Sequence, residues 1–171
     1  SAQSRVTAAV QNIPSEQRVK VYYAESPDGL ATECHTSFHI EPLRLAGGEN
    51  VHRCEQSNHY GMEKVSLEQI IAYQPTVIIS QERSFATKAT TNASWRNVQA
   101  VKAGRIVNIP HTPFNWVDRP PSFMRALGIQ WLANLLYPDR YPLDIRAETK
   151  AFYHLFLGVD LTDTDLDTVL N

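Results

Sequence analysis

The chain has 171 residues, of which 43% are hydrophobic and 20% charged, and these values are ordinary for a globular domain with its own hydrophobic core. Its 16 Lys and Arg residues against 18 Asp and Glu residues give a formal net charge of −2. This balance argues against binding to nucleic acid or to an anionic membrane, because both need an excess of positive charge. No apolar run approaches the roughly 18 residues of a membrane span, and the chain does not open with a basic stretch followed by an apolar one.

Two helical segments and one strand are predicted in the first third of the chain. Residues 6–12 fit the end of a helix, and Pro14 stops it. Residues 18–24 alternate apolar side chains with polar or amphipathic ones, which is the period of a strand. After a polar loop, residues 37–46 are typical of a helix with Phe38 facing inward, closed by two glycines.

The middle of the chain repeats this order of helix, strand and polar loop. Ser66 and Gln69 have the spacing of a capping box, in which two side chains satisfy backbone donors at the start of a helix, and that helix ends before Pro75. Residues 76–80 form a short apolar run bounded by turn residues, which is typical of a buried parallel strand. A polar loop and the weakly helical residues 84–90 follow.

The last part of the chain predicts one more strand among several helices. Residues 95–102 have a helical pattern, and residues 105–109 are a short apolar strand. Residues 123–137 predict a long helix that packs on more than one side, because few of its residues are polar. Residues 143–157 predict an amphipathic surface helix, and the acidic residues 161–171 add at most one short turn.

The alternation of strands and helices predicts βαβ units, hence an α/β fold: a three-layer lobe with a mostly parallel central sheet flanked by helices. In such a sheet, ligands bind beside the carboxyl ends of the strands. The loop after residues 105–109 lies at such an end and holds Trp116, Asp118 and Arg119 within four residues. We therefore expect this loop to be a recognition surface.

Four segments of the chain, taken in order and with their spacing, resemble a known family. They are residues 45–51 (LAGGENV), 65–79 (VSLEQIIAYQPTVII), 95–107 (WRNVQAVKAGRIV) and 116–136. The resemblance is to the C-terminal lobe of the periplasmic, helical-backbone solute-binding proteins that serve ABC importers of iron-siderophores, haem and cobalamin. It covers the chain from about residue 19 to about residue 137.

The resemblance implies two α/β lobes joined by one long helix, with a ligand held in the cleft between them and handed to an ABC permease in the membrane. Residues 1–12 are then expected to be the end of the connecting helix, residues 13–171 the C-terminal ligand-binding lobe, and the N-terminal lobe is expected outside this chain. The implied protein is a monomer without catalytic activity or an intrinsic cofactor. It is periplasmic, or extracellular and lipid-anchored, with its signal peptide removed, and its implied ligand is a metal chelate of the ferric siderophore, haem or cobalamin class.

An anionic metal chelate needs cationic donors and flat apolar faces. Arg83, Arg119, Trp116 and Tyr60 offer these groups on predicted cleft loops. Trp116, Asp118 and Arg119 resemble the Trp-x-acid-Arg pattern of the third cleft loop in the cobalamin-binding member of the family. The alternatives are an ion pair between Arg119 and Asp118, and packing of Trp116 under the prolines that follow. We expect residues 30–35, 59–62 and 115–119 to lie side by side on one rim and to face the second lobe.

The resemblance to the cobalamin-binding member points to two further residues of this chain. The C-terminal lobe of that member carries an acid that docks to arginines of the permease, and Glu68 resembles it because both follow a Val-Ser-x pattern at the start of a helix. Glu68 also suits this place because a carboxylate complements the helix dipole. An aromatic residue precedes that acid by six positions, and Met62 stands there in this chain.

Histidines offer a different chemistry. His35, His39, His52 and His59 lie close together in the sequence with both cysteines, but their spacing fits no zinc-finger pattern. We expect no intrinsic metal site. By loop position His35, His59 and His111 are the candidates to complete the coordination of a bound iron or nickel complex. A receptor for a nickel complex, or for another transition-metal complex, is therefore an alternative function.

The two cysteines, Cys34 and Cys54, flank one predicted helix. In a chain that resembles exported proteins they suggest a disulfide, worth roughly 3 kcal/mol in the chain-entropy model. Paired free thiols and metal ligation are the alternatives.

An α/β enzyme using Asp118, His111 or Cys34 is the rival interpretation from another class. The sequence has no glycine-rich phosphate loop, no G-x-S-x-G motif and no HExxH motif. These absences favour a binding protein.

Overall fold

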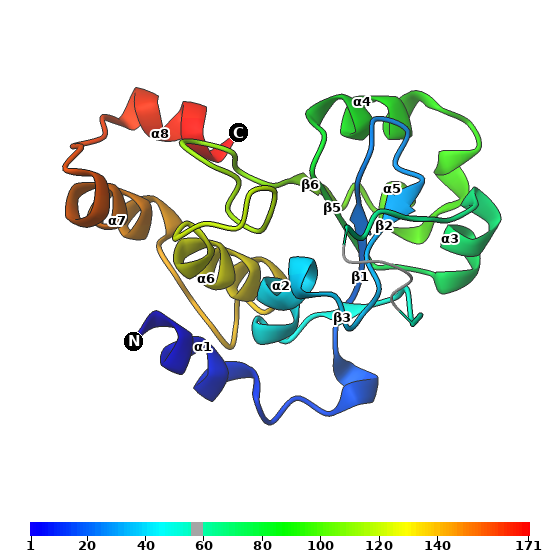
Figure 1. Ribbon diagram of the computed structural model, residues 1–171, viewed down its shortest axis with the longest axis horizontal. Coiled ribbons are helices and arrows are strands. Elements are labelled where there is room, and N and C mark those ends of the chain that lie inside the picture. The colour runs from blue at the N-terminus through cyan, green and yellow to red at the C-terminus, as the bar shows by residue number, and fades with distance from the viewer. Residues whose placement is uncertain (56–59) are drawn as a thin grey trace.

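The computed structural model describes residues 1–55 and 60–171, and these residues form a parallel sheet with the strand order β3-β1-β5-β6 (Figure 1). The strands of this sheet are β1 (Lys20–Ala24), β3 (Glu49–Asn50), β5 (Val77–Ser80) and β6 (Ile106–Asn108). A small antiparallel pair, β2 (Ala31–Thr32) with β4 (Glu63–Lys64), stands beside it. The predicted α/β class with a mostly parallel sheet is confirmed.

Helices cover both faces of this sheet (Figure 1). On one face, α1 (Ala2–Val10), α2 (Glu41–Leu45), α6 (Arg125–Leu136) and α7 (Ile145–Leu157) build a core that includes Val21 and Ile79 of the sheet. On the other face, α3 (Leu67–Tyr73), α4 (Arg83–Thr91) and α5 (Gln99–Lys102) pack on Tyr22 and Ile78. The remaining helices are α8 (Asp163–Leu170) and the 3₁₀ turns η1 (Ser15–Gln17), η2 (Phe38–Ile40) and η3 (Trp95–Asn97).

Burial on both faces explains why β1 does not alternate as its sequence suggests. Val21, Tyr22, Tyr23 and Ala24 are all fully buried, as expected for a strand in a parallel sheet with helices on both sides. Tyr22 tolerates this place because its hydroxyl donates to the carbonyl oxygen of Gly29 over 2.6 Å. The pattern predicted the strand correctly, but it gave no sign that the second face is covered as well.

Most predicted helices are present, with shifted boundaries. The capping box of Ser66 and Gln69 is confirmed at the start of α3. Residues 37–46 begin with η2 and continue as α2, and Phe38, which was predicted to face inward, is 48% exposed. The serine at position 37 accepts from the backbone N–H of His39, which starts the chain in a tight 3₁₀ turn and leaves the Phe38 ring outside.

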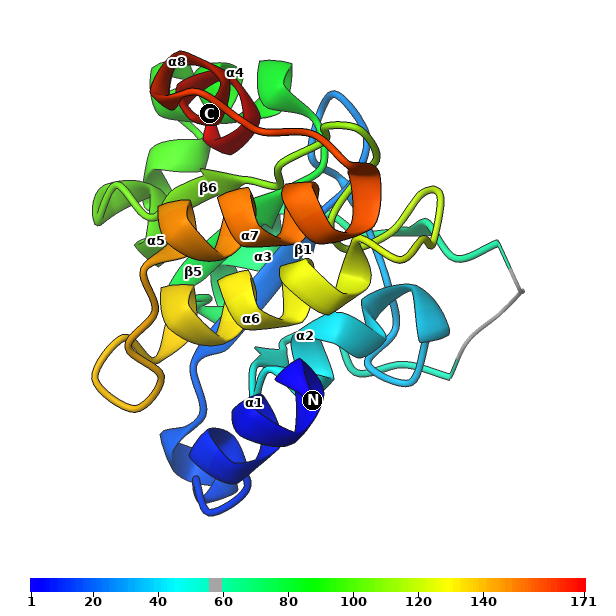
Figure 2. The ribbon, with the colours of Figure 1, turned by 90° about the vertical axis from the view of Figure 1, so that its left-hand side faces the viewer.

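The two ends of the described chain pack on the same layer. α1 lies against α6, and α7 runs alongside α6 (Figure 2). Arg5 of α1 donates to the Gln130 side chain over 2.9 Å. The acidic end of the chain forms α8, which is longer than the single turn expected. The assignment of residues 1–12 to an inter-lobe helix stays a prediction. None of the described helices is long and apolar enough to cross a membrane.

A glycine sets the distance between α6 and the loop before it. A Cβ atom added at Gly128 would lie 1.9 Å from the carbonyl oxygen of Trp116, far inside any tolerated contact. The Trp116 side chain is fully buried. The absence of a side chain at Gly128 therefore lets α6 sit directly on the backbone of the loop that holds Trp116.

We expect Gly128→Ala to lower the free energy of unfolding by about 1–3 kcal/mol, because the overlap outweighs the gain of about 1 kcal/mol that alanine brings to a helix. Urea unfolding followed by circular dichroism measures this. Thr90→Ala, on the exposed side of α4, serves as the control and should stay within about 0.5 kcal/mol. A Gly128→Ala protein as stable as the wild type would contradict the close approach.

Candidate functional site

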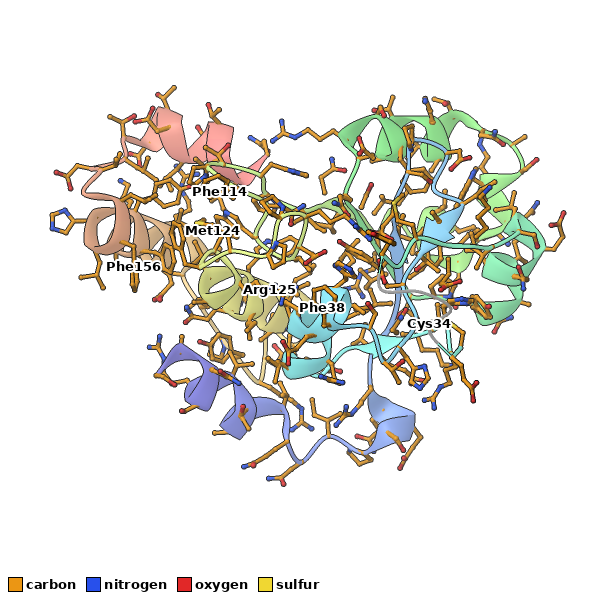
Figure 3. All side chains as sticks on the ribbon, viewed as in Figure 1. Cys34, Phe38, Phe114, Met124, Arg125 and Phe156 are labelled. Carbon is orange, nitrogen blue, oxygen red and sulfur yellow. A yellow bond between two sulfur atoms is a disulfide. The ribbon has the colours of Figure 1, made fainter. Side chains whose placement is uncertain are left out.

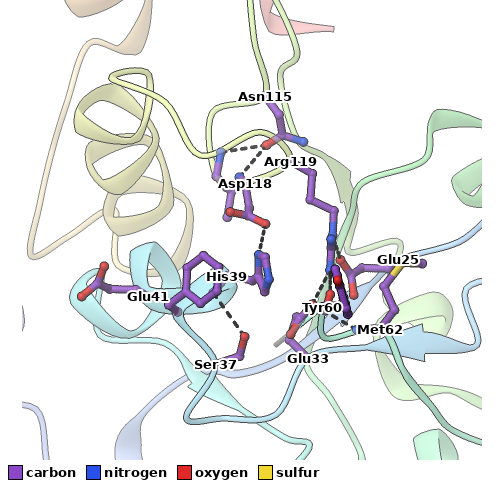
Figure 4. A network of polar contacts seen from close by, with 12 residues as sticks. Glu25, Glu33, Ser37, His39, Glu41, Tyr60, Met62, Asn115, Asp118 and Arg119 are labelled. Atoms are coloured by element: carbon purple, nitrogen blue, oxygen red, sulfur yellow. Dashed lines mark hydrogen bonds and ion pairs between the residues drawn. The ribbon is translucent and has the colours of Figure 1, made fainter. Parts of the chain in front are cut away.

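Three loops meet at Arg119, beside the carboxyl ends of the strands (Figure 4). Its Nε donates to Glu25 over 2.6 Å, and its Nη2 donates to Glu33 over 2.7 Å. The same Nη2 donates to the carbonyl oxygen of Tyr60, also over 2.7 Å. The predicted neighbourhood of residues 30–35, 115–119 and the described part of 59–62 is therefore confirmed. Arg119 pairs with two glutamates and not with Asp118.

Both glutamates are buried. Glu25 is 1% exposed and Glu33 0% exposed, and Oε2 of each has no hydrogen-bond partner among the described residues. Burial raises the pKa of Glu25 to about 8, Arg119 opposes this rise, and the charge of Glu33 adds to it. At neutral pH Glu25 therefore holds a proton, which lowers the negative charge that burial places beside Arg119.

The backbone around Arg119 takes uncommon conformations. Arg119 and Met62 both have φ of 57°, in the left-handed region, and Gly61 has φ of 67°. A Cβ atom at Gly61 would lie 2.0 Å from Oε1 of Glu33, so only glycine allows the loop to pass over that carboxylate. Left-handed non-glycine residues persist where surrounding contacts hold them, and they cluster at functional sites.

A second buried acid, on the same loop as Arg119, contacts η2 and α6. Asp118 is fully buried, with its Oδ2 2.5 Å from Nδ1 of His39 and its Oδ1 2.6 Å from Nη2 of Arg125. Arg125 also donates to the carbonyl oxygens of Val117 and Phe38, which brings it beside Phe38 (Figure 3). The prediction that Asp118 contacts a ligand is wrong for this conformation, because the carboxylate braces η2 and α6 and leaves no exposed oxygen.

Trp116 is also placed differently from the prediction. Its ring is fully buried, its Nε1 donates to the carbonyl oxygen of Thr112 over 3.2 Å, and it packs edge-on against Trp131 at 6.4 Å. The expectation that this ring offers a flat face to a ligand is therefore wrong. Indole burial is favoured by its large apolar area once the N–H has a partner.

Two other predicted residues lie together on the same rim. His111 follows β6, and Arg83 begins α4 after β5. Burial lowers the pKa of His111 below its ordinary value, and the charge of Arg83 lowers it further, so the imidazole is neutral at pH 7 and its lone pair can bind a metal. The Arg83 side chain is exposed, and Glu82 ahead of it gives α4 no side-chain cap.

The loop at residues 60–62 presents its side chains outward. Tyr60 is 83% exposed and Met62 is 44% exposed. His59 lies outside the described residues, so its predicted role stays a prediction. His35 does not join the Arg119 cluster. It lines a cavity along β3 together with Arg18 and other residues.

Cys34 and Cys54 form a disulfide with a Cα–Cα distance of 5.2 Å, as predicted. His52 stands beside them, and its Nδ1 lies 2.9 Å from the hydroxyl of Tyr73. Cys34, His52 and Cys54 are the one group among the described residues with metal-ligand spacing. The bridge removes both thiolates, so metal ligation by these cysteines is not the arrangement that forms. Their role is to tie the loop after β2 to the loop after β3.

The sequence analysis missed the acids and the bases that hold the site. Glu25 and Glu33 have partners 94 and 86 positions away, and His39 lies 79 positions from Asp118, whereas Arg125 lies only 7 positions from it. One signal was available for Glu25, because a charged residue directly after a buried strand lies at the ligand-binding edge of the sheet. Nothing local distinguishes the other three.

Residues 1–113 match the family described as "Periplasmic binding protein", and the chain belongs to this family. Its architecture agrees with an ABC transporter solute binding protein from Sulfurospirillum deleyianum at a TM-score of 0.94 and 49% identity, over 98% of this chain and 52% of that one. The molybdate-binding protein MolA of Haemophilus influenzae is 29% identical over 148 residues, 85% of this chain and 40% of that protein.

MolA has also been solved with molybdate bound, and it superposes with a TM-score of 0.78 and 26% identity over 94% of this chain and 48% of that one. The chain thus spans about half the length of these two solved relatives. The family is described as periplasmic binding proteins, and these relatives are described as solute-binding or molybdate-binding proteins. MolA is named as a periplasmic binding protein.

We expect the free energy of unfolding of the wild type to fall between about pH 6.5 and 8 by up to about 1.4 kcal/mol per pH unit. The folded-state pKa of Glu25, about 8, lies above its ordinary value of 4.5. Between these two pH values the folded chain therefore binds more protons than the unfolded chain, and the free energy of unfolding falls as the pH rises. Histidines with a lowered pKa act in the opposite direction, and their effect fades as the pH rises above their ordinary value of 6.5. Glu25→Gln should remove this decline, because an amide does not titrate.

Chemical unfolding at a series of pH values measures this dependence, with the exposed Glu16→Gln as a control that should keep the wild-type slope. Equal slopes in wild type and Glu25→Gln would show that Glu25 is not protonated at neutral pH.

Proposed function

We propose that this chain is the C-terminal lobe of the solute-binding component of an ABC importer, and that it holds a metal-containing anion against a second lobe. The main support is the convergence of the loops on Arg119 at the carboxyl rim of a parallel sheet, in a chain of the periplasmic binding protein family. Ligands of open α/β sheets bind at this rim. The proposed location is the periplasm, or the outer surface through a lipid anchor.

The charge available to an anion comes from Arg83 more than from Arg119. Nε and Nη2 of Arg119 already donate to Glu25, Glu33 and the carbonyl oxygen of Tyr60, whereas Arg83 has no hydrogen bond or ion pair from its side chain among the described residues. The first turn of α4 adds backbone N–H groups with no side-chain cap, and such groups favour anions. Neutral His111 beside Arg83 supplies a donor atom for a metal centre.

The first ligand class is an organic metal chelate, such as a ferric siderophore, haem or cobalamin. The exposed Tyr60 ring and the Met62 thioether support it, since both can cover an apolar scaffold. The second class is a tetrahedral metal oxyanion. Its support is the likeness to MolA, which is named as molybdate-binding, together with the compact group of Arg83, His111 and the start of α4.

Isothermal titration of the protein with both lobes distinguishes these classes. The probes are molybdate and tungstate, sulfate as a non-metal oxyanion of the same shape, and a ferric trihydroxamate, haem and cyanocobalamin. We expect one metal-containing class to bind, and Arg83→Gln and His111→Ala each to weaken it at least tenfold, about 1.4 kcal/mol.

The exposed Arg96→Gln is a matched control outside this rim and should bind like the wild type. Wild-type affinity in both Arg83→Gln and His111→Ala would remove this group from the site. If sulfate binds as tightly as molybdate, the metal-containing class is wrong, and if none of the probes binds, the receptor proposal itself fails.

Glu68 is proposed to dock to the permease. It lies in the first turn of α3, is exposed, and has no ion-pair partner among the described residues. An unpaired exposed carboxylate suits a cationic partner surface. We expect Glu68→Ala to reduce ligand uptake in cells several-fold without changing the affinity measured by titration.

Asp139→Ala, which removes an exposed acid from the loop after α6, should leave uptake unchanged. Unimpaired uptake by Glu68→Ala would contradict the docking role and would leave the interaction with the helix dipole as the explanation for Glu68.

A further inference from the structure

A cavity of about 210 Å³ runs along the outer edge of β3, where His35 lies, and its lining does not include Arg119, Arg83 or His111. β3 is the edge strand of the parallel sheet, next to β1. The wall is formed by the η1 segment, by η2 and α2, by β3 itself and by the residues after it. These are Ser15, Arg18, His35, Ile40, Leu43, Arg44, Gly48, Glu49, Asn50 and Arg53.

The cavity combines an apolar floor with a cationic rim. Ile40 and Leu43 are 2% and 0% exposed and belong to the hydrophobic core. The rim carries the guanidinium groups of Arg18, Arg44 and Arg53, and the lining contains a single carboxylate, Glu49. Positive charge therefore exceeds negative charge in a chain whose formal net charge is −2.

The three arginines retain free donors. Arg18 donates only from Nε, to the carbonyl oxygen of Ile13 over 3.5 Å. Arg44 lies 3.6 Å from Glu41, and Arg53 donates from one Nη to Glu49 over 3.0 Å. Each guanidinium carries five N–H donors, so most of them have no partner among the described residues. The anchoring acids orient the side chains without saturating them.

We propose that this cavity binds a small organic anion, with a carboxylate or phosphate group on an apolar body. Planar guanidinium groups bind such anionic groups through paired, charge-assisted hydrogen bonds, and the apolar body lies against the methylene stems of the arginines above the Ile40–Leu43 floor. A cavity of about 150 Å³ is enough for a benzene ring, so this one has room for a ring and its anionic substituent. The cavity is a second site, independent of the cleft ligand.

Titration of the 171-residue chain with phenyl phosphate tests the proposal, with inorganic phosphate and phenol as the two halves of the probe. We expect phenyl phosphate to bind more tightly than either half, and to bind less tightly in high salt because exposed charges are screened. Arg44→Gln combined with Arg53→Gln should weaken binding at least tenfold. Both side chains are more than half exposed, so the fold should survive, and thermal melting checks this.

The control Arg96→Gln, another exposed arginine outside the cavity, should bind phenyl phosphate like the wild type. The proposal is overturned if phenyl phosphate does not bind at millimolar concentration, or if the double variant and the control bind it equally. Binding of inorganic phosphate as tight as that of phenyl phosphate would overturn the role of the apolar floor. None of these variants touches Arg83 or His111, so failure here and failure of the proposed function are distinguishable.

Discussion

The contact of Arg119 with two buried glutamates holds together the loops at the carboxyl ends of the strands. Glu25 follows β1, Glu33 follows β2, and the carbonyl oxygen of Tyr60 belongs to the loop before β4, so one guanidinium joins three connections. Buried charges are unfavourable unless they are paired, and removing one partner leaves the other uncompensated. The raised pKa of Glu25 relieves part of this burden, because a proton replaces the second cation that two ionised glutamates would need. Loop geometry at this rim therefore depends on the contacts of Arg119 and on the proton of Glu25.

This arrangement changes which residues can meet a ligand. The sequence predicts that the loop of residues 115–119 is a recognition surface, because it carries an aromatic ring, an acid and a guanidinium. In the structure, all three side chains contact other parts of the same chain. Trp116 packs in the core, Asp118 is held by His39 and Arg125, and Arg119 is held by glutamates. A guanidinium balanced in this way contributes little net charge to a cleft. Among the described residues of this rim, Arg83 at the start of α4 carries a positive charge for which no ion pair forms.

The fold could be predicted from the sequence because its signals are local. The apolar run of β5 and the Ser66–Gln69 capping box act over a few residues, and both were identified correctly. The site could not be predicted in the same way, because its contacts join residues up to 94 positions apart. Burial of Trp116 depends on how closely α6 approaches, which is set at Gly128, and no pattern within the loop carries that information. The family resemblance supplied the position of the loop but not the orientation of its side chains.

The disulfide connects the Arg119 cluster with the cavity along β3, the two regions at which we propose that ligands bind. Cys34 directly follows Glu33, which pairs with Arg119, and directly precedes His35, which lines the cavity along β3. Its partner Cys54 follows Arg53, on the rim of the same cavity. Closing a loop of 20 residues restricts the unfolded chain by roughly 3 kcal/mol in the entropy model, and in the folded state it fixes Glu33 and Arg53 relative to each other. Asn50 reinforces the link by donating to the carbonyl oxygen of Glu33 over 2.7 Å. The edge strand β3 is short, so its place in the sheet rests on these side-chain and covalent ties as much as on its own backbone pairing with β1.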